Sequence, residues 1–147
     1  MKKNLALLMV FFAGFFALQS CDEKKIDFDK LPSAAQAFIT QYFPGEEVTY
    51  AERDKDDGQK DYKVRLSDGT EIEFDENGNW TSVDCGYSAL PDGILPAAAT
   101  EYIAANYPDA KAYKVEKEYG GYDVHITTGQ ELVFNSNWEF VRVSTGD

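Results

Sequence analysis

The sequence YKVRLSDGTEIEF at residues 62–74 decides the fold, because it returns as YDVHITTGQELVF at residues 122–134. The matching Tyr, Val, Gly, Glu and Phe residues are each 60 positions apart, and apolar and polar residues alternate on both sides of the glycine. Such alternation is typical of β-strands with one buried face, and the glycine favours a tight turn. The two stretches therefore predict a pair of similar antiparallel hairpins.

A second pair of similar segments comes before the hairpins, at residues 31–42 and 95–106, and it predicts two helices. Each segment begins with Leu-Pro, and its apolar residues recur at helical spacing through an aromatic-Ile pair. The proline suits a first helical turn, and the prolines Pro44 and Pro108 stop the two helices. Because these segments lie 64 residues apart, a short deletion must fall in a connection between helix and hairpin.

The repeat extends beyond the hairpins, where Trp80 and Val83 are matched with Trp138 and Val141 at a spacing of 58 residues. The sequence therefore predicts an α+β fold with two tandem repeats, residues 31–85 and 86–147, each a helix followed by a four-stranded antiparallel meander. We expect the meanders to form one eight-stranded sheet with both helices on one face, which leaves the other face open.

The N-terminus predicts secretion. Residues 1–20 combine two lysines with an apolar run of 14 residues, which is shorter than the roughly 20 residues of a membrane span. The run ends at Cys21, and the segment resembles a bacterial lipoprotein signal in which that cysteine carries the lipid. A plain signal peptide or a short membrane anchor is the alternative. Residues 21–30 are expected to form a polar tether to the membrane, with the folded part in the periplasm or on the cell surface.

Composition excludes several functional classes. The formal net charge of −12 repels nucleic-acid phosphates, so nucleic-acid binding is not expected. His125 is the single histidine, without other ligands at metal-binding spacing, and no cofactor motif is found. Glu71 and Glu73 share one strand face, but their spacing on a strand is ordinary for a solvated surface. The sequence therefore predicts a protein that is not an enzyme and has no metal or cofactor.

The repeated helix and hairpin motifs resemble the PepSY-like, β-lactamase-inhibitor-like lipoproteins of the bacterial envelope. The resemblance is carried by Leu-Pro, the aromatic-Ile pair, Tyr-x-Val-x-Leu, Asp-Gly and Phe-Asp-x-x-Gly-x-Trp in the first copy. The second copy departs from it with Asn135-Ser136-Asn137-Trp138 at the last turn. The resemblance implies tandem helix-plus-sheet units with an open sheet face, which relatives of this architecture present to the enzymes they inhibit.

The open face is the predicted interface. We expect a protein or peptide partner to bind there, because exposed aromatic side chains commonly anchor interfaces. The predicted interface residues are an aromatic band with charged neighbours: Trp80, Trp138, Phe140, Lys63, Arg65, His125, Glu71 and Glu131. The alternative for the aromatic residues is packing at the strand edge or under the hairpin.

A second hypothesis is a module that binds a cation or small ligand through acidic loops. Four aspartates, Asp54, Asp56, Asp57 and Asp61, surround Gly58 in a segment predicted to be a loop. Oxygen-rich loops bind Ca²⁺, but the spacing of an EF-hand is absent and the second copy lacks the cluster. A solvated hairpin is the simpler interpretation.

Overall fold

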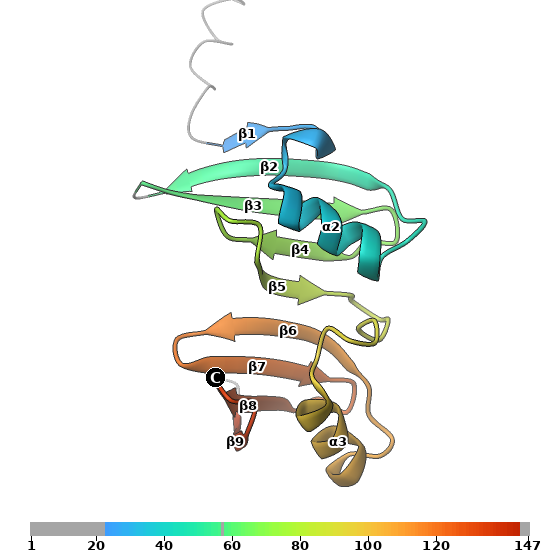
Figure 1. Cartoon of the computed structure of the whole chain (residues 1–147). Coiled ribbons are helices and arrows are strands. Elements are labelled where there is room, and N and C mark those ends of the chain that lie inside the picture. Colours follow the sequence, from blue (N-terminus) through green and yellow to red (C-terminus); the bar gives the residue numbers. More distant parts are fainter. Residues whose placement is uncertain (1–22, 57, 145–147) are drawn as a thin grey trace, which may run out of the picture.

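The structure, a computed structural model, describes residues 23–56 and 58–144 as one antiparallel sheet with two α-helices (Figure 1). The predicted signal peptide and the lipidation residue Cys21 lie outside the described residues. No described helix has the length and apolar character needed to cross a membrane. The elements, in chain order, are β1 (Glu23–Lys25), the short 3₁₀ helix η1 (Phe28–Lys30), α2 (Ser33–Tyr42), β2 (Val48–Asp56), β3 (Gln59–Leu66), β4 (Glu71–Phe74), β5 (Trp80–Asp84), α3 (Ala97–Asn106), β6 (Ala112–Glu118), β7 (Gly121–Ile126), β8 (Glu131–Asn135) and β9 (Phe140–Ser144).

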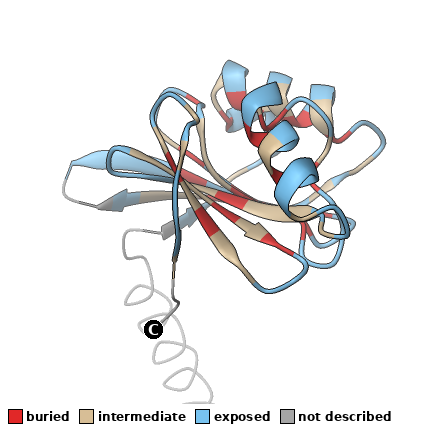
Figure 2. Ribbon diagram, turned by 90° about the horizontal axis from the view of Figure 1, so that it is seen from below, coloured by how far each residue is buried: buried red, intermediate tan, exposed pale blue. Residues whose placement is uncertain are grey.

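The strands follow each other across the sheet in chain order, from β1 at one edge to β9 at the other, and every neighbouring pair is antiparallel. Each α-helix precedes four of these strands. Both helices lie on the same side of the twisted sheet, α2 over the first half and α3 over the second (Figure 2). The predicted α+β class and the single open face are therefore present.

The core lies between the helices and the sheet. Ala35 and Ile39 of α2, and Ala99 and Ile103 of α3, are the buried residues of the two helices. Ring contacts join the layers, because Phe38 meets Phe74 edge to face at 5.8 Å and Tyr102 meets Phe134 at 5.9 Å. The sheet contributes fully buried side chains to this layer, among them Val64, Ile72, Phe74, Val83, Val115, Val124, Leu132 and Phe134.

Two details of the predicted sheet are wrong. The sheet has nine strands rather than eight, because residues that we expected to act only as a tether form β1, which pairs with β2 through Lys25 and Glu52. The charged segment predicted as a loop instead extends β2 and β3, whose pairing continues to Asp56 and Gln59. Backbone pairing here tolerates charged residues such as Lys24, Lys25, Lys55 and Lys60, because their side chains are exposed.

The match between Trp80 and Trp138 is also wrong. Phe74 pairs with Trp80 in the first half, and Phe134 pairs with Phe140 in the second. The spacing of 60 residues therefore continues to the end of the last strand, and Trp80 corresponds to Phe140. Trp138 occupies the turn, where it has a φ of 62°.

Candidate functional site

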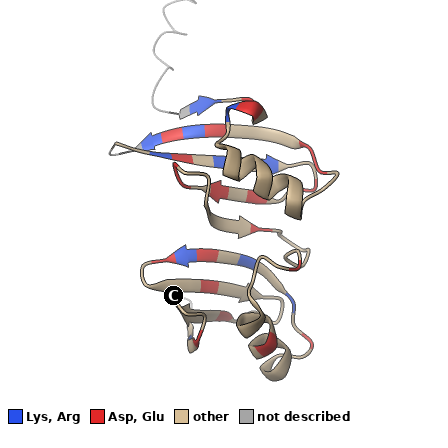
Figure 3. Ribbon diagram, viewed as in Figure 1, with Lys and Arg blue, Asp and Glu red and all other residues tan. Residues whose placement is uncertain are grey.

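The open face of the sheet is the candidate site. Because side chains alternate along a strand, the registers of β2 to β9 assign each residue to the helix-covered face or to the open one. Figure 3 shows that the charged residues lie mainly on the strands, whereas the helices carry few. We define the open face by these residues: Tyr50, Glu52, Lys63, Arg65, Glu71, Glu73, Ser82, Asp84, Lys114, Glu116, Asp123, His125, Glu131, Val133, Arg142 and Ser144.

In the first half, the open face carries ion pairs across neighbouring strands, in which all side chains except the buried Glu52 are about half exposed. The Arg65 guanidinium lies 2.7 Å from a Glu71 carboxylate oxygen and donates hydrogen bonds to it from both Nε and Nη2. Lys63 Nζ lies between two carboxylates, 3.7 Å from Glu73 and 4.0 Å from Glu52. Exposed pairs of this kind contribute only about 0–1 kcal/mol each to stability. They leave charged groups at the surface, where a partner can reach them.

At the outer side of this half, a ring is held beside the carboxylates. The Tyr50 hydroxyl donates a 2.5 Å hydrogen bond to Glu52, and the Lys25 ammonium lies 5.7 Å from the centre of the Tyr50 ring. Tyr50 is an aromatic residue of the open face that was not among the predicted interface residues. The repeat could have indicated Tyr50, because Tyr50 and Glu52 align with Lys114 and Glu116, which lie 64 positions later in the sequence.

In the second half, the open face is more sheltered. Lys114 Nζ lies 2.8 Å from Glu116, and His125 Nε2 lies 3.4 Å from the other oxygen of the same carboxylate. Burial alone would raise the pKa of the Glu116 carboxyl, but the Lys114 hydrogen bond and charge, assisted by His125, outweigh it and lower that pKa. The predicted residues His125 and Glu131 face each other in this cluster. Lys114 and Glu116 were not predicted because they lie in β6, outside the repeated alternation at residues 122–134.

Asp123 is the most perturbed carboxyl of this face. Burial, together with a hydrogen bond and like charge from Glu131 and the charges of Glu118 and Glu116, raises its pKa from 3.8 to about 6. Two neighbouring carboxylates cannot both ionise without repulsion, so a shared proton is favoured. The second half therefore carries a group that titrates near neutral pH.

We expect Asp123→Asn to stabilise the protein near neutral pH. The raised pKa means that the ionised carboxylate is disfavoured in the folded state above pH 6, a cost that fades as the pH falls from about 6 towards 3.8. Because solvent screens this half-exposed group, the expected gain in unfolding free energy is only about 1 kcal/mol. Thermal unfolding above and below pH 6 measures it. Asp61→Asn, at an exposed aspartate of β3, is the control, and an equal gain at both pH values would contradict the assignment.

The structure places the predicted aromatic band elsewhere. Trp80, Trp138 and Phe140 lie on the helix-covered side, half-buried against the core, and do not share a face with Lys63 or Arg65. The Trp138 ring stacks on Tyr122 with centroids 3.8 Å apart, and Phe140 stacks on Tyr102 of α3 at 4.3 Å. The expectation of an aromatic band on the open face is therefore wrong, and the packing alternative is correct.

The remaining titratable candidates show no catalytic arrangement. Cys85 is buried, and that burial, with the nearby Asp68 and Asp84 charges, raises the pKa of its thiol despite a Thr70 hydrogen bond, so the reactive thiolate is disfavoured. Within residues 23–56 and 58–144, no three His, Cys, Asp or Glu side chains gather closely enough to hold a metal ion. Of the four aspartates in the predicted acidic loop, Asp57 lies outside the described residues, and Asp54 pairs with Asp61 across the hairpin.

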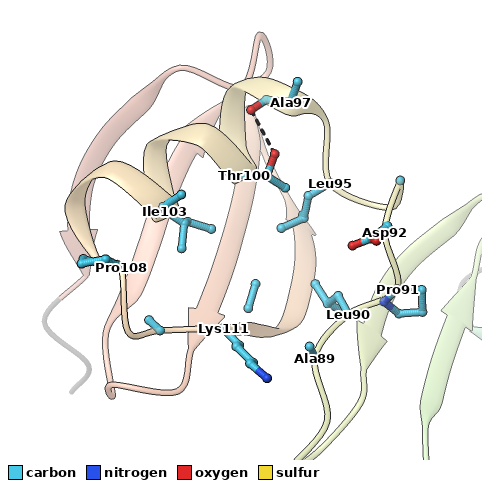
Figure 4. Close-up of a pocket in the computed structure, with 14 residues that line it drawn as sticks. Ala89, Leu90, Pro91, Asp92, Leu95, Ala97, Thr100, Ile103, Pro108 and Lys111 are labelled. Carbon is cyan, nitrogen blue, oxygen red and sulfur yellow. Dashed lines mark hydrogen bonds between the residues drawn. The ribbon is translucent and has the colours of Figure 1, made fainter.

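A pocket lies on each side of the sheet. On the open face, a pocket of about 330 Å³ is lined by four carboxylates and by a lysine, a tyrosine and a threonine: Glu52, Asp54, Asp61, Glu73, Lys63, Tyr62 and Thr81. On the helix side, a pocket of about 660 Å³ lies between the connection after β5, helix α3 and the start of β6 (Figure 4). Its lining is mostly apolar, and the Thr100 hydroxyl already donates to the Ala97 carbonyl at 3.1 Å.

Comparison with known proteins gives one family. The family described as "Putative beta-lactamase-inhibitor-like, PepSY-like" matches this chain twice, at residues 14–69 and 60–142. No functionally curated protein matches the sequence.

Several solved structures are similar over almost their whole length. A "putative periplasmic protein" of the DUF2874 family from Bacteroides vulgatus is 37% identical, with a TM-score of 0.80 over 86% of this chain and 99% of that one. A Bacteroides thetaiotaomicron protein described as a "putative calcium-regulated periplasmic protein" is 36% identical, with a TM-score of 0.80 over 84% and 97%. A further B. vulgatus protein, described as a "putative periplasmic protein of unknown function", is 33% identical, with a TM-score of 0.79 over 83% and 98%.

Proposed function

This chain belongs to the PepSY-like, β-lactamase-inhibitor-like family, and from that premise we propose that it is a non-catalytic binding protein of the bacterial cell envelope. Its ligand would be a protein or peptide that docks on the open face. Cys21 would carry a lipid that holds the folded part beside a membrane, in the periplasm or at the cell surface. The periplasmic descriptions of the similar structures support this location.

One observation carries the proposal: a face that crosses the sheet from β2 to β9 is left uncovered by helices and carries charged side chains of both signs. Half-exposed Lys63, Arg65, Glu71 and Glu73 offer paired charges that a complementary surface can engage. Charge complementarity of this kind fixes partner choice and raises association rates. The proposed contact residues are therefore Lys63, Arg65, Glu71, His125 and Glu131, without the tryptophans.

The interpretation as two copies of one unit is part of the same proposal. Both α-helices have ten residues, and both end with a backbone hydrogen bond from an aromatic residue, Phe43 to Ile39 and Tyr107 to Ile103. The first strand after each helix has a register shift at equivalent places, Val48/Tyr50 and Ala112/Lys114. The two family matches add support, although they overlap and do not follow the boundary predicted after residue 85.

Charge reversal on the open face tests the proposal. In a pull-down from envelope extract, we expect residues 22–147 to capture a partner protein. The Lys63→Glu/Arg65→Glu variant should bind this partner about tenfold or more weakly. Lys30→Glu/Lys117→Glu makes the same change in net charge at exposed residues away from the open face, and should bind normally. Calorimetry with the identified partner gives the affinities. Equal binding by both double variants would refute the open face as the interface.

A cation-binding module is the second candidate, because one similar structure is described as calcium-regulated and a carboxylate-lined pocket lies on the open face. The effect of added calcium on the melting temperature distinguishes the cation-binding module from the protein-binding module. A rise in melting temperature with added calcium, lost in Asp54→Asn/Asp61→Asn, would favour the cation module, since a ligand of the folded state stabilises it. The protein-binding proposal expects no such rise.

A further inference from the structure

The two edges of the sheet differ. At the first edge, β1 has three residues, and Lys24 and Lys25 are exposed. Short strands with lysines are a common way to prevent further strand pairing. At the other edge, β9 has five residues and exposes Val141 at 55% and Val143 at 39%. The backbone groups on the outer side of β9 have no strand beside them within the described chain.

Strand β5 shows how an edge like that of β9 can be paired. The counterpart of β9 in the first half is β5, because Val83 lies opposite Ile72 as Val143 lies opposite Leu132. The outer side of β5 is occupied by β6 through three residue pairs: Ser82 with Glu116, Val83 with Val115, and Asp84 with Lys114. The corresponding residues of β9 are Arg142, Val143 and Ser144.

A register shift at the start of these strands does not prevent pairing. Both β5 and β9 contain one between the third and fourth pairs with their neighbours. A bulge of this kind often blunts an exposed edge. In β5, however, the three residues beyond the shift pair fully with β6, so the same three positions of β9 can accept a strand.

We propose that β9 pairs with β9 of a second copy of this chain, antiparallel about a twofold axis. With Val143 opposite its own symmetry mate, Arg142 lies opposite Ser144 of the second copy, and the joint has three pairs, as between β5 and β6. Val143 then meets Val143 on the helix-covered side, as Val83 meets Val115. This register also avoids placing Arg142 directly opposite Arg142, a like-charge pair that would be unfavourable.

The lysines of β1, at the first edge of the sheet, favour a second copy that pairs through its own β9. A head-to-tail contact between β9 and the opposite edge would generate open chains, and β1 with its lysines opposes it. A twofold contact uses β9 twice, closes at two copies, and leaves the open face of each copy accessible. The dimer is therefore independent of the partner-binding role proposed above.

Cysteine cross-linking in the full-length protein tests the pairing and its register. Directly opposed residues of antiparallel strands have Cβ atoms roughly 4.5–5.5 Å apart, close to disulfide geometry. Under mild oxidation, Val143→Cys should form a disulfide dimer. Arg142→Cys and Ser144→Cys should cross-link to each other when the two variants are co-expressed. Tyr119→Cys, at a fully exposed position in the β6–β7 turn, controls for random collision.

A second variant distinguishes loss of the dimer from loss of the fold. Adding Ser144→Lys to Val143→Cys should reduce the dimer about tenfold, because each new lysine would lie opposite Arg142 of the second copy as a like-charge pair, while an unchanged melting temperature shows that the fold is intact. Cross-linking of Val143→Cys at or below the level of Tyr119→Cys would overturn the proposal. A Val143→Cys adduct with a different envelope protein, in place of the dimer, would overturn it as well.

Discussion

Phe74→Ala is expected to lower the free energy of unfolding by about 3–5 kcal/mol, which is a large part of the total for a domain of this size. The Phe74 side chain is fully buried in β4 and meets the Phe38 ring of α2 edge to face at 5.8 Å. Removing it deletes one of the contacts that join the first helix to the sheet and leaves a cavity between the layers. Urea unfolding followed by circular dichroism measures the loss.

The matched comparison is an aromatic side chain without neighbours. Tyr119 is fully exposed in the turn between β6 and β7, so Tyr119→Ala should change stability by less than about 0.5 kcal/mol. Phe134→Ala should resemble Phe74→Ala, because Phe134 is equally buried and meets Tyr102 of α3. A loss below about 1 kcal/mol for Phe74→Ala would mean that α2 does not pack on the sheet as described.

Gly78→Ala is expected to destabilise the protein strongly. Gly78 has a φ of 84°, and a Cβ atom there would lie 2.8 Å from both the Ala35 amide nitrogen and Pro32 Cβ. The turn between β4 and β5 therefore packs directly on the beginning of α2. Conformational strain of about 1–2 kcal/mol and overpacking of about 1–3 kcal/mol give an expected loss of about 2–5 kcal/mol.

Gly69→Ala separates the two causes. Gly69 has a similar φ of 90°, but no atom lies within 4 Å of the position its Cβ would take. Its substitution should cost only the strain, about 1–2 kcal/mol. Denaturant unfolding of both variants gives the difference. Equal losses would show that the turn does not contact α2 closely.

The sequence predicted the helices and hairpins in which apolar residues recur at a regular spacing. The helices at Ser33–Tyr42 and Ala97–Asn106 lie within the predicted segments, because apolar spacing and proline boundaries are local signals. The alternation around Gly69 and Gly129 likewise assigned Lys63, Arg65, Glu71, His125 and Glu131 to the open face. Strand β1 was not predicted because Glu23, Lys24 and Lys25 have no apolar alternation, and it is ordered by backbone pairing with β2.

The tryptophan error has a physical cause in strand geometry. Counting back from Val83 in steps of two directs Trp80 to the open face. A register shift beside Phe74 leaves Thr81 without a paired residue, which reverses the alternation and turns Trp80 towards the core. Trp138 was matched by residue type alone. In the structure it takes the turn position of Gly78, as shown by the equivalent hydrogen bonds of Gly78 to Asp75 and Trp138 to Asn135.

The order of the strands across the sheet has a consequence for how the chain acquires its structure. Since each strand pairs with the next one along the chain, contact order within each half is low, and such topologies fold quickly. The three residue pairs between β5 and β6 form the main seam between the halves. The N-terminal half can therefore fold as a cooperative unit while the rest of the polypeptide is still emerging, and later provide the template on which β6 nucleates.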